Sequence, residues 1–130
     1  MGIVHALIGL ANARDDSLQP MEVNALVDSG ALHLCIPQHI ANQLKLEKQS
    51  ERAVTLADGR EQTVDYVGPV TVSFEGRKCL TGALVLGNEA LLGAIPMEDM
   101  DLVIHPSRQN LSVNPASPNI PMSLAKGLQR

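Results

Sequence analysis

Aromatic side chains are scarce in this chain, and it carries no excess of positive charge. Tyr66 and Phe74 are the only two aromatic residues among 130, there is no tryptophan, and the formal net charge is -4. A protein that binds nucleic acid commonly stacks bases on aromatic rings and holds phosphates with lysine and arginine. We therefore expect no nucleic-acid partner.

Cysteine is also scarce. Cys35 and Cys79 are too few for a disulfide scaffold and lack the CxxC spacing of a metal site. Both lie in apolar stretches, which favours buried, reduced thiols. The four histidines of the chain are not spaced as metal ligands either. We expect no metal site.

Long apolar runs are missing as well. Met1–Leu10 is apolar, but it has no basic segment and is too short to cross a bilayer. It is a poor signal peptide, so we expect a soluble cytoplasmic protein without membrane contact. A chain of this length fits one domain with a hydrophobic core. We expect that domain to span residues 1–115, followed by a proline-containing C-terminal tail over 116–130.

Alternating apolar and polar residues predict an all-β domain with one or two short helices. Helical spacing indicates one helix near Pro37–Lys45 and another at Ile95–Met100. The charged stretch Glu47–Arg52 is expected to be a loop. The expected strands are Ile3–Ala11, Met21–Val27, Leu32–Ile36, Ala53–Ala57, Gln62–Val67, Val70–Phe74, Cys79–Leu86, Leu102–Ile104 and Leu111–Val113. Asp58-Gly59 separates two of these runs and predicts a tight hairpin turn.

One apolar run ends in an aspartate. Asn24-Ala25-Leu26-Val27 leads directly into Asp28-Ser29-Gly30-Ala31. A carboxylate with apolar surroundings lowers the stability of the fold unless it is hydrogen-bonded, and such a carboxylate is often found where it has a catalytic role. Asp-Ser-Gly is also ordinary turn chemistry, so the motif alone leaves both interpretations open.

The segments that follow this motif favour the chemical interpretation. Ile36-Pro37 comes shortly after it, the Asp58-Gly59 hairpin follows, and Leu91-Leu92-Gly93 leads into the second predicted helix. Together with Ala25–Ala31, this order resembles the retropepsin-like (retroviral-type) aspartic peptidases, especially their small single-domain bacterial members. The resemblance extends from about Met21 to Pro115.

The resemblance implies a closed β-barrel-type acid protease monomer that works as a two-fold homodimer. Each chain would contribute Asp28 as a catalytic residue, and the two carboxylates would share one proton. One carboxylate would activate a water that attacks the carbonyl of an extended peptide substrate, and the other would donate a proton. Such an aspartic endopeptidase needs no metal or organic cofactor.

The resemblance also implies roles for neighbouring residues. Support for the active-site loop would come from Ser29, Gly30 and Ala31, with the serine hydroxyl structural and not nucleophilic. Packing beside that loop would come from Leu91, Leu92 and Gly93. A flap that closes over substrate would be formed by Leu56, Ala57, Asp58, Gly59 and Arg60. An ordinary surface hairpin is the alternative for these last five residues.

Two positions depart from the viral pattern. Viral enzymes carry an acidic residue after the Asp-Thr-Gly-Ala run and an arginine after the apolar-apolar-Gly element, and these two residues pair. Leu32 and Ala94 stand there instead, so no charge is left without its partner. Dimer contacts and specificity must therefore differ. A catalytically silent dimeric domain for peptide binding or assembly is the alternative function on the same fold.

Overall fold

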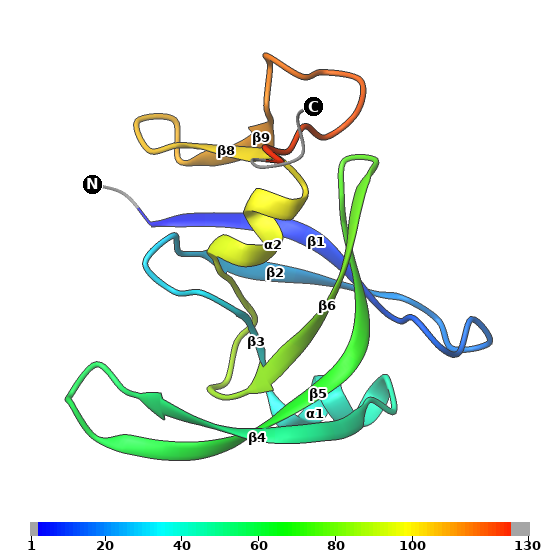
Figure 1. Cartoon of the computed structure of the whole chain (residues 1–130), viewed down its shortest axis with the longest axis vertical. Coiled ribbons are helices and arrows are strands. Elements are labelled where there is room, and N and C mark those ends of the chain that lie inside the picture. The colour runs from blue at the N-terminus through cyan, green and yellow to red at the C-terminus, as the bar shows by residue number, and fades with distance from the viewer. Residues whose placement is uncertain (1–2, 126–130) are drawn as a thin grey trace.

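The computed structural model describes residues 3–125 and folds them into nine strands and two short helices (Figure 1). The strands are β1 (Val4–Asn12), β2 (Met21–Val27), β3 (Leu34–Ile36), β4 (Glu47–Thr55), β5 (Glu61–Phe74), β6 (Arg77–Val85), β7 (Leu91–Leu92), β8 (Leu102–His105) and β9 (Asn110–Val113). The helices are α1 (Gln38–Gln43) and α2 (Ala94–Asp99). Within this described part, no helix is long and apolar enough to cross a membrane.

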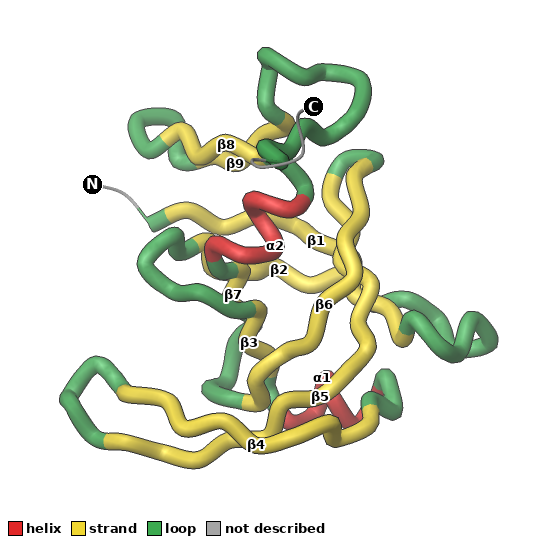
Figure 2. The backbone as a smooth tube through the Cα atoms, viewed as in Figure 1, coloured by secondary structure: helices red, strands yellow, loops and turns green. Residues whose placement is uncertain are grey.

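Six of the strands close into a barrel. Hydrogen-bonded neighbours follow the order β1, β2, β7, β3, β6 and β5, and β5 pairs again with β1. The remaining strand of this sheet, β4, lies outside the ring as one arm of a long hairpin with β5, while β8 and β9 form a separate two-stranded sheet (Figure 2). The prediction of a mostly β fold with short helices and a closed barrel is confirmed.

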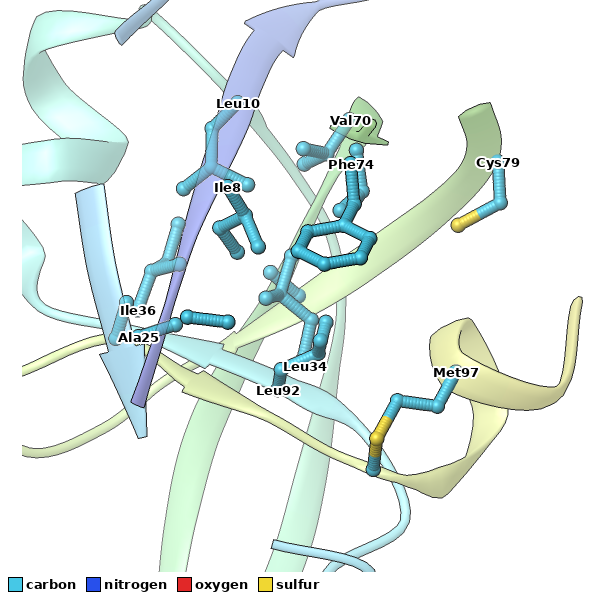
Figure 3. Close-up of a cluster of buried hydrophobic side chains, with 14 of the residues drawn as sticks. Ile8, Leu10, Ala25, Leu34, Ile36, Val70, Phe74, Cys79, Leu92 and Met97 are labelled. Carbon is cyan, nitrogen blue, oxygen red and sulfur yellow. The ribbon is translucent and has the colours of Figure 1, made fainter. Parts of the chain in front are cut away.

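Alternate side chains of the strands fill the barrel. On β1, Ile8 and Leu10 are buried, whereas Leu7 is exposed, as the period of two in a strand requires. Branched side chains from the other strands meet them in one cluster, of which Figure 3 labels Leu34, Ile36, Val70 and Leu92 among others. Each such side chain contributes about 1.5–3 kcal/mol when it is fully buried. This cluster holds the ends of β2, β3 and β7 in place.

Each helix begins directly after a proline or a glycine. The first, α1, follows Pro37, whose φ is -66°, and buries Ile40 and Ala41 against the core. The second, α2, follows Gly93 and buries Met97. The two predicted helices are confirmed, with ends shifted by one or two residues.

The charged stretch Glu47–Arg52 belongs to strand β4, so its prediction as a loop is wrong. Nearly all side chains of β4 are exposed, yet its backbone pairs antiparallel with β5 from Glu47 opposite Gly68 to Thr55 opposite Glu61. Alternation of apolar and polar residues indicates a strand that has one buried face. Strand β4 has no buried face, so its charged part lacks this pattern. Its backbone hydrogen bonds to β5 determine its conformation.

Two of the expected strands are one continuous element. β5 runs through Gly68-Pro69, which separates the two expected strands and is a cis peptide bond. The pairing of β5 with β6 shifts in register between Val67 and Val70. The irregularity is therefore a local change of pairing inside a strand of 14 residues.

A buried arginine joins the start of β6 to the residues after α2. Arg77 is only 5% exposed. Its Nη1 donates to the carbonyl oxygens of Met100 (3.0 Å) and Asp101 (3.3 Å), and its Nη2 donates to the carbonyl oxygen of Ser117. The guanidinium thereby satisfies three backbone acceptors on segments that are distant in sequence.

Asp101 is the second centre of this network. Its carboxylate accepts hydrogen bonds from the Ser117 hydroxyl, from Asn114 Nδ2 (3.0 Å) and from the backbone N–H of Met122 (3.0 Å). These donors lower the pKa of Asp101 to about 2. Ser117 and Met122 lie in the predicted tail, so part of that tail contacts the barrel domain. The boundary at residue 115 stays a prediction, and 126–130 lie outside the described residues.

We predict that Arg77→Met lowers the free energy of unfolding by about 2–4 kcal/mol, because it leaves buried carbonyl oxygens without donors. Urea unfolding measures this change. Lys78→Met is the matched control, since Lys78 is the exposed neighbour of Arg77 and surface changes usually stay within about 0.5 kcal/mol. Equal stability of the two variants would contradict the role of the network.

A second prediction concerns pH. Because folding lowers the pKa of Asp101 from 3.8 to about 2, the ionised carboxylate stabilises the fold above pH 3.8, and this contribution is lost as the pH falls through about 2. The substitution Asp101→Asn tolerates the positive φ of 58° at this position. The difference in unfolding free energy between the wild type and Asp101→Asn should shrink as the pH is lowered from about 5 to about 2. A difference independent of pH over this range would refute the assignment.

Candidate active site

Strand β2 carries Asp28 to the edge of the barrel. Ala25 and Val27 are buried, and Asp28 follows them as an exposed residue. The backbone N–H of Leu26 donates to Ala90 O (2.9 Å), and that of Asp28 donates to Leu92 O (3.1 Å). The backbone of Asp28 is thus fixed by β7 although its side chain is accessible in the single chain.

The residues after Asp28 form a tight turn around its carboxylate. The N–H of Gly30 donates to Asp28 Oδ1 (2.9 Å), and the N–H of Ala31 donates to Asp28 O (3.2 Å). A Cβ at position 30 would lie 3.1 Å from the same Oδ1, so a glycine suits this close approach. One carboxylate oxygen is therefore oriented by a backbone donor, as in an Asx turn.

Leu91–Gly93 lies directly against this turn. A Cβ on Gly93 would come within 2.8 Å of Ala31 O and 2.7 Å of the carbonyl carbon of Leu32. Next to it, the N–H of Ala94 donates to Ala31 O (2.8 Å) and that of Ile95 donates to Leu32 O (2.9 Å). The structure thus brings the two predicted segments together. Backbone hydrogen bonds join them at the positions where viral enzymes use an ion pair.

The Ser29 hydroxyl takes no part in the hydrogen bonds of the Asp28 turn. Ser29 is exposed, and its side chain makes no hydrogen bond to another residue within 3–125. It lies beside Asp28 at the mouth of an open pocket. No histidine lines that pocket, so the described residues around it do not form the histidine-based relay that would activate this hydroxyl as a nucleophile.

The pocket at Asp28 has a volume of about 370 Å³. Its walls come from the start of β1, the end of β2 and the β8 end, and the lining residues are Ile3, Val4, Leu26, Val27, Asp28, Ser29, Ile104 and Pro106. Asp28 is the one ionisable side chain among them. Sequence reasoning did not assign Ile3, Ile104 or Pro106 to the site, because they lie far from Asp28 in the chain and carry no chemical signature.

A larger recess, about 640 Å³, lies between β6, α2 and residues 122–124. It contains none of the residues that the sequence predicted for the site.

Among residues 3–125, no group of three His, Cys, Asp or Glu side chains is placed to hold a metal ion.

Leu56–Arg60 forms the exposed tip of the β4–β5 hairpin. The N–H of Leu56 donates to Arg60 O (2.8 Å), and Gly59 has a φ of 87°, as a tight turn requires. Backbone and side-chain hydrogen bonds from Arg60 lower the pKa of Asp58. In Figure 2 this tip and the loop after β2 project toward the same side of the barrel. The tip does not line the pocket at Asp28, so its role as a flap stays a prediction.

Comparison with known proteins assigns the family. A family model described as "Aspartyl protease" matches residues 19–86, which include Asp28 and the whole β4–β5 hairpin tip. The fold is similar to that of the EIAV protease complexed with the inhibitor HBY-793, at 21% sequence identity and a TM-score of 0.55, over 75% of this chain and 88% of that one. No curated protein matches. This chain belongs to the aspartyl protease family and has a retropepsin-like fold.

Proposed function

We propose that the protein is an aspartic endopeptidase whose site contains two Asp28 carboxylates, one from each chain of a homodimer. The observation that carries the proposal is the Asp28 turn. Its carboxylate is accessible, one oxygen accepts the N–H of Gly30, and the turn is fixed against Leu91–Gly93 by backbone hydrogen bonds. A rigid, accessible carboxylate is what general acid–base catalysis requires.

The second chain supplies what a single chain lacks. Asp28 is the one carboxylate at its pocket, whereas peptide hydrolysis without a metal needs an acid and a base together. Two carboxylates a few ångströms apart cannot both ionise easily, so they share a proton and their apparent pKa values move apart. The ionised carboxylate removes a proton from a water, whose oxygen attacks the carbonyl carbon of the substrate, while the protonated carboxyl donates to the carbonyl oxygen. The C–N bond of the tetrahedral intermediate then breaks, and the leaving amine takes a proton from the carboxyl that accepted one from the water. Neither step uses a cofactor.

The substrate in this proposal is a peptide in extended conformation. It lies between the Asp28 loop and the β4–β5 hairpin, whose tip (Leu56–Arg60) closes over it as a flap. Backbone hydrogen bonds to both elements would hold the peptide in register. We place the activity in the cytoplasm, in keeping with the free thiols Cys35 and Cys79.

A silent peptide-binding or assembly domain is the second candidate function. The observation in its favour is the replacement of the viral acid–arginine pair by Leu32 and Ala94. Backbone hydrogen bonds from Ala94 and Ile95 nevertheless hold the loop at this place, so loss of the pair does not leave the loop unsupported. We therefore favour the enzyme.

We predict that Asp28→Asn lowers the rate of peptide cleavage by at least about 100-fold, because the amide cannot act as base or acid. The measurement is the cleavage of a broad peptide library at several pH values by purified protein. Asp16→Asn is the matched control, since Asp16 is exposed in the turn between β1 and β2, and it should cleave like the wild type.

Two outcomes would decide against the enzyme. Unchanged cleavage by pure Asp28→Asn protein would show that Asp28 is not catalytic. No cleavage by the wild type under any condition, together with peptide binding by a folded dimer, would instead establish the silent domain.

Dilution gives a separate test of the shared site. Because a half-site is inert, activity per chain should fall as the protein is diluted below the dissociation constant of the dimer. Sedimentation measures that constant, and peptide cleavage is followed over the same concentrations. Constant activity per chain far below the dissociation constant would contradict a site built from two chains.

A further inference from the structure

A cluster of three side chains links the β4–β5 hairpin to the loop that contains Asp28. The guanidinium carbon of Arg52, from β4, lies 4.1 Å from the centre of the Tyr66 ring, from β5. The His33 ring meets the same Tyr66 ring edge-on, with 6.1 Å between centroids and 69° between planes. His33 belongs to the loop between Asp28 and β3. The three side chains therefore connect the arms of the hairpin with the candidate active-site loop.

The backbone of β6 fixes the position of the Tyr66 ring. A Cβ on Gly82, in β6, would collide with this ring, so the ring lies against the backbone of β6 where a side chain is absent. A cation above an aromatic ring is attracted by the electron-rich face of that ring. Tyr66 thus acts as a fixed platform that limits where the long Arg52 side chain can place its charge.

The cluster lies within reach of a peptide bound at Asp28. The hydrogen bond from Ala31 N–H to Asp28 O brings the Cα atoms of these residues within about 7 Å. Two further residues to His33 add at most about 7 Å. His33 is therefore within about 14 Å of Asp28, which is the length of about four residues of an extended peptide.

Arg52 holds a charge that its surroundings do not neutralise. Among the residues that the structure describes, no carboxylate forms an ion pair with it, although its neighbours on the hairpin are paired: Lys48 contacts Glu51 (2.7 Å) and Asp65 (3.5 Å). Burial and the nearby charge of Arg52 lower the pKa of His33. Near neutral pH, Arg52 is the permanent cation of the cluster, and its N–H groups are available to a carboxylate.

We propose that Arg52, held on the Tyr66 ring beside the Asp28 loop, selects peptide substrates that carry an aspartate or glutamate near the bond to be cleaved. This inference rests on the proposed function, because it assumes that the peptide lies between the hairpin and the Asp28 loop. Arg52 would be a binding residue, and Tyr66 would be the residue that positions it.

The expected preference is modest. Exposed ion pairs are worth at most about 1 kcal/mol, which corresponds to a factor of up to about five in binding or in kcat/KM. Salt screens such a pair, so the preference should decline as ionic strength rises from about 0.05 M to about 0.5 M.

The test compares peptides that differ by one glutamate or glutamine, with that residue placed in turn at each position around the cleaved bond. The wild type should cleave one glutamate peptide up to about five times faster than the otherwise identical glutamine peptide. Arg52→Gln should bring the ratio close to one. Tyr66→Leu should reduce the ratio and Tyr66→Phe should keep it. Lys78→Gln, which removes an exposed charge elsewhere, should leave it unchanged.

Binding of the same peptide pairs to Asp28→Asn protein, measured by calorimetry, separates this inference from the proposed function. An Arg52-dependent preference in binding, without cleavage by the wild type, would support the inference and refute the enzyme. Cleavage without any preference for glutamate, or a preference that survives in Arg52→Gln, would overturn the inference and leave the enzyme intact.

Discussion

The candidate site depends on one junction between backbones, where the end of β2 meets β7 and Gly93. The N–H of Asp28 donates to Leu92 O, and Gly93 has no Cβ to hold the backbone of Ala31 and Leu32 away. Because Leu92 is fully buried in the barrel core, the position of Asp28 is tied to a close-packed part of the molecule. The carboxylate is accessible, yet its backbone has little freedom.

This junction explains how the chain can lack the ion pair of the viral enzymes. Ala94 and Ile95 donate backbone hydrogen bonds to Ala31 and Leu32, so the loop is held without charged side chains. Leu32 is 52% exposed in the single chain, and an exposed apolar residue next to Asp28 fits a surface that a second chain or a peptide covers in the proposed dimer.

The sequence predicts those parts of the molecule that carry a local signal. The alternation on β1, the run into Asp28, Pro37 and the Asp58-Gly59 turn each specify their own structure. The first part of strand β4, Glu47–Arg52, was missed because both its faces are solvated and its order comes from pairing with β5. The pocket residues Ile3 and Ile104 were missed because only the closed barrel brings them to Asp28. The contact of His33 with Tyr66 likewise joins segments with no common pattern in the sequence.

The central claim is that two chains build one site, and subunit mixing tests it most directly. Wild-type protein is mixed with an increasing excess of Asp28→Asn protein under conditions where dimers exchange chains, and peptide cleavage is measured at a fixed amount of wild type. If each active site needs an aspartate from both chains, activity falls in proportion to the wild-type fraction, because wild-type chains become trapped in mixed dimers. Activity that stays constant as the variant is added would contradict the account, since each chain would then carry a complete site of its own.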